Sequence, residues 1–124
     1  MPNEERRFSW RARLNSFRYA GQGLRALMRT EHNAWIHLVL TILVLVLSIV
    51  LKISRGEALA LVIVIALVWM AELFNTAMEK IMDFISKEHH PHIQVIKDMA
   101  AAAVLIAAVA AVVVGCLIFI PKLL

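Results

Sequence analysis

Three long apolar segments constrain this chain more than any other feature of its sequence. They cover residues 34–52, 57–84 and 99–120, and the third carries no charged side chain at all. A helix needs about 20 apolar residues to cross the hydrocarbon core of a bilayer. The sequence therefore predicts an all-α membrane protein with three transmembrane helices, formed by a single domain over 1–124.

The composition excludes a soluble globular enzyme. Of the 124 residues, 61% are apolar and 18% are charged, and the mean hydropathy is +0.77. A soluble chain of this length needs a polar exterior, which three long apolar segments cannot supply. The single Cys116 lies inside an apolar run and suggests neither a disulfide nor a zinc ligand.

Positive charge is concentrated before the first apolar segment and predicts the topology. Cytoplasmic flanks carry an excess of Lys and Arg, which places the N-terminus and the 85–98 loop in the cytoplasm and the C-terminus outside. No cleaved signal peptide is expected, because the first apolar segment begins only after these arginines. The cluster suits an anionic membrane surface, and no nucleic-acid partner is expected. Its members are Arg6, Arg7, Arg11, Arg13, Arg18, Arg25 and Arg29.

Residues 8–30 are predicted to form an amphipathic helix that lies on the inner leaflet. Apolar side chains recur there at steps of three, four or seven, and most arginines fall between them. We expect Gly21-Gln22-Gly23 to interrupt this helix. The alternative is a positively charged topology anchor without a part in catalysis. The apolar positions are Trp10, Leu14, Phe17, Leu24 and Met28.

Four polar residues of the second segment share one helical face. At about 100° per residue, Glu79 lies about 20° from Glu72, with Asn75 and Asp83 to either side. Ionisable groups at membrane depth are costly, so a functional role is the default interpretation. Glu72 is the candidate general base toward an alcohol. Glu79, with Glu31 upstream, offers hard oxygen ligands for Mg²⁺ bridging nucleotide phosphates.

Structural alternatives exist for several of these polar residues. Asp83 is typical of a solvated charge near a helix end, and Asn75 of a hydrogen bond between helices. Lys97-Asp98 is predicted to open the third helix, where a lysine usually extends its amine toward water. The loop histidines His89, His90 and His92 are more typical of a solvated turn than of a zinc site.

Small residues every four positions along the third segment indicate close helix packing. The seam serves either packing within one chain or a homo-oligomer, and the spacing does not decide between them. Its members are Ala103, Ala107, Ala111 and Gly115.

The stripe Glu72-Leu-Phe-Asn75-Thr-Ala-Met-Glu79-Lys-Ile-Met-Asp83, followed by Glu88-x-His90 and Lys97-Asp98, resembles the bacterial integral-membrane diacylglycerol kinase and undecaprenol kinase family. The likeness covers roughly residues 15 to 120. The string Glu31-His-Asn-x-x-Ile-His37 looks like the undecaprenol kinase branch, because diacylglycerol kinases usually have a glutamate at position 37. The family's N-terminal arginine falls at Ala12 and its Gly-Ser at Ala100-Ala101, so roles of those residues are not transferred.

The resemblance implies a homotrimer of three-span subunits in the bacterial cytoplasmic membrane, using ATP and Mg²⁺ to phosphorylate a membrane lipid alcohol. It implies Glu72 as the base, Asn75 as an orienting residue, and Glu31 with Glu79 as metal ligands. Substrate contacts are expected from Glu72, His37 and Trp35. The nucleotide is expected to contact Tyr19, Glu31, Glu79, Glu88, His89, His90, Lys97 and Asp98.

We expect undecaprenol as the acceptor, with diacylglycerol as the alternative. A remote alternative is a small proton-coupled transporter subunit in which Glu72 changes protonation. Such a protein needs an acid reachable from both membrane faces, whereas the acids here cluster toward one end of the spans. The chain has no Walker loop and none of the protein-kinase motifs, which excludes a conventional kinase fold.

Overall fold

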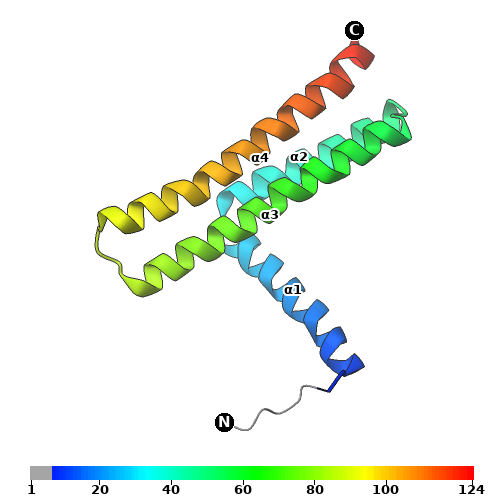
Figure 1. The fold of residues 1–124 in the computed structure, drawn as a ribbon. Helices are drawn as coiled ribbons and strands as arrows, with labels where there is room; N and C mark the ends of the chain where they lie inside the picture. The colour runs from blue at the N-terminus through cyan, green and yellow to red at the C-terminus, as the bar shows by residue number, and fades with distance from the viewer. Residues whose placement is uncertain (1–6) are drawn as a thin grey trace.

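A computed structural model describes residues 7–124, so Arg6 of the arginine cluster lies outside the described part. Within it the chain forms four helices and no strand: α1 (Trp10–Thr30), α2 (His32–Val50), α3 (Arg55–Ile85) and α4 (Pro91–Leu123) (Figure 1). α2, α3 and α4 are long and apolar enough to cross a membrane. The predicted all-α fold is confirmed, with three helices long and apolar enough to span a membrane.

α1 runs unbroken through Gly21-Gln22-Gly23, so the predicted interruption there is wrong. Neither glycine adopts a positive φ, and no proline removes a backbone donor. The chain turns instead at Glu31, whose extended backbone (φ −118°, ψ 115°) ends α1 and begins α2. Trp35 secures this elbow by donating its indole N–H to the Met28 carbonyl at 2.8 Å. α1 consequently leaves the bundle at a steep angle (Figure 1).

The connection from α2 to α3 is a tight turn in which Lys52 adopts a left-handed conformation with φ 50°. The Ile53 N–H bonds to the Ser48 carbonyl at 3.2 Å, and the Lys52 N–H to the Ile49 carbonyl at 3.3 Å. These two bonds form the Schellman motif that satisfies the last carbonyls of a helix. Ser54 then begins α3 by accepting the Glu57 N–H at 3.2 Å.

The connection from α3 to α4 covers only 86–90, shorter than the predicted 85–98 loop. α4 begins at Pro91, because proline suits the first helical position and the His90 side chain caps the helix by accepting the His92 N–H at 3.2 Å. Lys97-Asp98 therefore lies in the second turn of α4 and does not open it. The helix also continues through Pro121 to Leu123, beyond the predicted end at 120.

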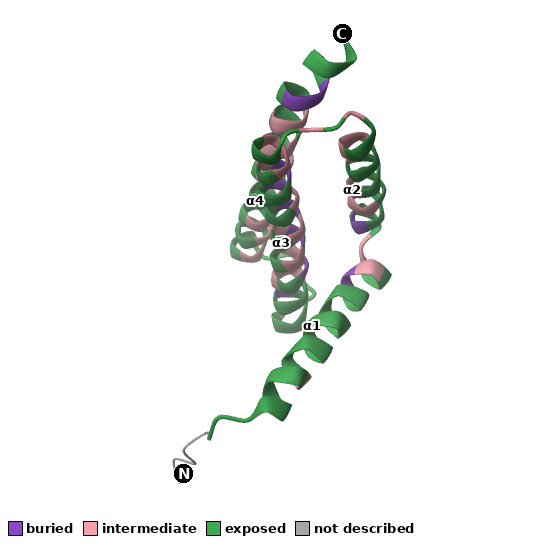
Figure 2. Cartoon of the chain, turned by 90° about the vertical axis from the view of Figure 1, so that its right-hand side faces the viewer, coloured by how far each residue is buried: buried purple, intermediate pink, exposed green. Residues whose placement is uncertain are grey.

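α3 and α4 pack along one another, whereas α2 stands apart from them over much of its length (Figure 2). The buried cluster Leu61, Ile118 and Phe119 joins the helices near the turn between α2 and α3. Most large apolar side chains of the spans remain exposed. A Cβ built on Gly115 of the small-residue seam would meet no atom within 4 Å. One chain alone thus leaves surface that lipid or further copies must cover.

The left-handed Lys52 gives a stability prediction. Replacing it with glycine removes the Cβ clash of that conformation, so Lys52→Gly should stabilise the fold by about 1 kcal/mol. The matched control is Lys80→Gly, at an exposed position inside α3, which should destabilise by about 1 kcal/mol. Thermal unfolding midpoints in detergent measure both, and a lower midpoint for Lys52→Gly would contradict the described turn.

Candidate active site

Glu72 is the buried ionisable residue around which the site is built. It is 2% exposed on α3, and its Oε1 lies 2.8 Å from His37 Nε2 on α2. A carboxylate withdrawn from water is costly unless a hydrogen bond or charge compensates it. The partner His37 therefore accounts for how this acid is held between two apolar helices.

A second polar contact joins the same helices one turn away. The Trp69 indole N–H donates to Thr41 Oγ1 at 3.1 Å, and Thr41 Oγ1 donates to the His37 carbonyl at 2.6 Å. Sequence reasoning did not assign Thr41 or Trp69 to the site. The available signal was spacing: Thr41 follows His37 by four residues and Trp69 precedes Glu72 by three, so each pair shares a helix face.

A polar cavity of about 410 Å³ opens beside Glu72. Its two carboxylates come from α3, and no lysine or arginine lines it among the described residues. The buried Asn75 Oδ1 and Thr76 Oγ1 have no hydrogen-bond partner within the described chain. Unsatisfied buried oxygens call for a further ligand or neighbour. The lining comprises Asn33, Ile36, His37, Glu72, Asn75, Glu79, Ala101, Val104, Leu105 and Ala108.

Glu31 lies half-buried at the elbow between α1 and α2. It is near enough to Glu79 for their charges to interact, although it does not line the polar cavity. No group of three or more His, Cys, Asp or Glu side chains capable of holding a metal occurs among residues 7–124. Two carboxylates nevertheless fit Mg²⁺, which is usually bound by one or two carboxylates together with water and substrate phosphates.

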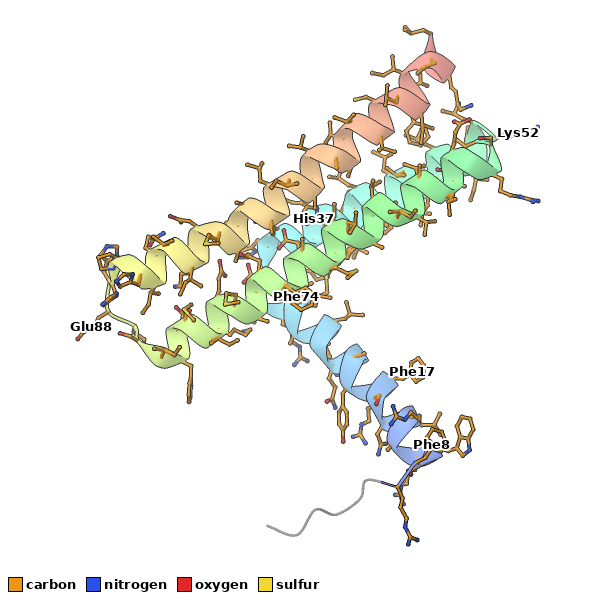
Figure 3. All side chains as sticks on the ribbon, viewed as in Figure 1. Phe8, Phe17, His37, Lys52, Phe74 and Glu88 are labelled. Carbon is orange, nitrogen blue, oxygen red and sulfur yellow. The ribbon has the colours of Figure 1, made fainter. Side chains whose placement is uncertain are left out.

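A second polar cavity of about 180 Å³ lies beside the connection from α3 to α4. Lys97 Nζ donates to Asp83 Oδ1 at 2.7 Å, which ties α4 to α3 across this cavity. Glu88, labelled in Figure 3, lies in the connection itself. The lining comprises Asp83, Ser86, Lys87, Glu88, His89, His90, Ile93, Gln94 and Lys97.

Most of the sequence-predicted site residues line one of the two polar cavities. Asp98 lines neither cavity and accepts a hydrogen bond from Gln94 Nε2 at 2.8 Å. Tyr19 is exposed on α1 and lines neither cavity. Trp35 also lines neither, and its indole N–H is bound to the Met28 carbonyl. His37, by contrast, lies between α2 and α3 (Figure 3).

An apolar cavity of about 350 Å³ adjoins the polar one and shares His37 and Ala108 with its lining. It lies between α2, α3 and α4, and its lining holds no Asp, Glu, Lys or Arg. Glu72 lines the polar cavity, and its partner His37 lies at the boundary between the polar and the apolar space. Such a site suits proton transfer from a hydroxyl group attached to an apolar molecule.

The sequence is similar to a family of known proteins. The sequence model of the family described as prokaryotic diacylglycerol kinase matches residues 18–119. The chain is 37% identical to an undecaprenol kinase of Bacillus subtilis over 98% of this chain and 94% of the relative. It is 35% identical to a diacylglycerol kinase of Synechocystis sp. over 96% of this chain and 70% of the relative. A diacylglycerol kinase of Escherichia coli is 33% identical over 81% of this chain and 82% of the relative.

Proposed function

This chain belongs to the prokaryotic diacylglycerol kinase family and is a lipid kinase, and we propose that it transfers the γ-phosphoryl group of ATP to undecaprenol with Glu72 as the general base. The observation that carries the proposal is the buried Glu72, held by His37 where a polar cavity adjoins an apolar one. Membership in a kinase family also leaves no reason to retain the transporter alternative.

Glu72 accepts the proton of the lipid hydroxyl as the oxygen attacks the γ-phosphorus. The bond from that phosphorus to the β-phosphate bridging oxygen breaks, and ADP leaves. Phosphoryl transfer needs little covalent chemistry from the protein, so positioning and electrostatics supply most of the acceleration. Asn75, one helical turn along α3 in the same cavity, orients the reacting groups, and its unpaired Oδ1 supports this role.

Glu31 and Glu79 are the proposed Mg²⁺ ligands. The interaction between their charges supports the assignment, because two neighbouring carboxylates repel one another until a cation neutralises them. When bound, Mg²⁺ would neutralise the phosphates of the nucleotide. Trp35 secures the elbow that carries Glu31 by donating its indole N–H to the Met28 carbonyl.

The cavity beside the connection from α3 to α4 is the proposed site for the rest of the nucleotide. Lys97 offers a positive charge to phosphate oxygens, and the loop supplies Glu88, His89 and His90 for polar contacts. Asp98, held by Gln94, and Tyr19 on α1 retain their proposed nucleotide roles only if nucleotide binding draws them toward this cavity.

The apolar cavity supports undecaprenol over diacylglycerol. Its polar side chains His37, Thr41 and Trp69 are already hydrogen-bonded within the protein. Ester carbonyls of a diacylglycerol would find few free donors there, and a buried unpaired carbonyl costs free energy. The hydroxyl is the only hydrogen-bonding group of a polyprenol, so its chain needs no donor in the cavity. The match to the relative named undecaprenol kinase, which covers 94% of that protein, also supports undecaprenol as the acceptor.

We further propose a homotrimer in the bacterial cytoplasmic membrane, with the N-terminus in the cytoplasm and α1 on the inner leaflet. Exposed Trp10, Leu14 and Phe17 suit contact of α1 with lipid. Large apolar side chains of the spans remain exposed in one chain, which leaves surface for neighbouring copies to cover.

The first prediction concerns the base. Glu72→Gln keeps the shape and a hydrogen-bonding group but cannot take the proton, so kcat should fall by about 10² to 10⁴, while nucleotide binding persists. Lipid phosphorylation with labelled ATP and a separate nucleotide-binding measurement check this. Near-normal turnover would remove Glu72 from the chemistry.

The second prediction concerns the metal. Glu31→Gln and Glu79→Gln should each raise the Mg²⁺ concentration needed for half-maximal activity by about tenfold or more, because each removes an anionic ligand. Glu57→Gln is the matched control, since Glu57 pairs with Lys122 at 3.3 Å near the other end of α3. An unchanged Mg²⁺ dependence in both site variants would contradict the assignment.

The third prediction concerns the lipid. Purified protein offered undecaprenol and diacylglycerol in the same vesicles should phosphorylate undecaprenol with the higher kcat/KM. A preference for diacylglycerol would reverse the substrate assignment and leave the kinase chemistry in place.

A further inference from the structure

Two hydrogen bonds cross from α2 to α3, one turn apart on each helix: His37 to Glu72, and Trp69 to Thr41. We propose that His37 is the positioning residue of the Glu72 carboxylate, and that the Trp69 to Thr41 contact is a clamp that keeps His37 in place. The inference rests on the proposed role of Glu72 as base and adds three positioning residues to it.

The chemistry of the pair fixes the direction of its hydrogen bond. An ionised carboxylate can only accept, so a Glu72 ready to act as a base requires the proton of His37 to be on Nε2. That bond occupies Oε1 at 2.8 Å. Glu72 Oε2 has no hydrogen-bond partner among the described residues and is left to take the proton of the alcohol. His37 thus selects which carboxylate oxygen meets the substrate and holds it in one orientation.

The clamp has an equally definite direction. The indole N–H of Trp69 can only donate, and Thr41 has a single hydroxyl proton, which goes to the His37 carbonyl at 2.6 Å. Thr41 therefore accepts from Trp69 with a lone pair. The same hydroxyl is bonded to the backbone of His37, so the clamp acts on the residue that holds the base.

The packing of α2 explains why one contact is insufficient. α2 stands apart from α3 over much of its length (Figure 2), and its packing against the core cluster, through Val44, Leu47 and Leu51, lies toward its C-terminal end. Near Glu72, two hydrogen bonds one turn apart oppose rotation of α2 about its own axis. The His37 and Trp69 rings also meet edge to face, with centroids 6.5 Å apart. This ring contact joins the residue that holds Glu72 directly to the donor of the clamp.

Ser48 provides a matched control on the same helix. Its Oγ donates to the Val44 carbonyl at 2.6 Å, the same local bond that Thr41 makes. No donor from α3 reaches Ser48 among the described residues. Thr41→Val and Ser48→Ala therefore remove equivalent local bonds, but only Thr41→Val removes the clamp.

The test measures kcat and KM for lipid and ATP in the full-length protein in vesicles. Thr41→Val and Trp69→Phe should each lower kcat by about 10- to 100-fold with KM for ATP unchanged, and Thr41→Ser should restore most of the loss. The double variant Thr41→Val/Trp69→Phe should lose no more kcat than either single variant, because both substitutions remove the same contact. Ser48→Ala should leave kcat unchanged.

His37→Leu and His37→Gln extend the test to the pair itself. The leucine variant should lose at least as much kcat as the clamp variants, and the glutamine variant, which keeps an N–H donor, should lose less. Normal kcat in His37→Leu, or equal losses in Thr41→Val and Ser48→Ala, would overturn the inference. If Glu72→Gln is inactive at the same time, the proposed base stands and only the positioning role fails.

Discussion

The structure depends on how a carboxylate is kept between helices that face lipid. Glu72 is 2% exposed, and withdrawing an acid from water costs several kcal/mol unless a partner compensates it. His37 is that partner, and it comes from α2, which packs against α3 less closely than α4 does. This hydrogen bond, the Trp69 to Thr41 contact and the apolar packing of α2 together hold α2 beside the polar cavity.

The remaining parts of the site are set by the two connections around it. The elbow at Glu31 brings one acid toward Glu79, and the short connection between α3 and α4 places Lys97 against Asp83 at 2.7 Å. A lipid kinase must bring a charged nucleotide and an apolar alcohol to the same atom. Polar cavities toward one end of the bundle and an apolar one between the helices provide those two environments side by side.

Hydropathy was enough to predict the helical fold and the three spans, because in a bilayer the apolar length of a segment decides whether it crosses. The spacing of Glu72, Asn75 and Glu79 also predicted a shared face, and all three line one cavity. Single glycines, prolines and charged residues predicted the ends of the helices less well. Glycines at 21 and 23 did not break α1, since a helix tolerates glycine when nothing demands a turn, and Pro91 began α4 earlier than the charges at 97 and 98 suggested. The contact between Thr41 and Trp69 could not be derived from sequence, because it depends on how α2 rotates against α3.

The most direct test of the central claim is an experimental structure of the protein in lipid with Mg²⁺, a non-hydrolysable ATP analogue and undecaprenol. We expect the lipid hydroxyl within hydrogen-bond distance of Glu72 Oε2 and in line with the γ-phosphorus, while Glu72 Oε1 stays hydrogen-bonded to His37. A hydroxyl bound elsewhere, or a Glu72 side chain turned away from both the alcohol and His37, would contradict it.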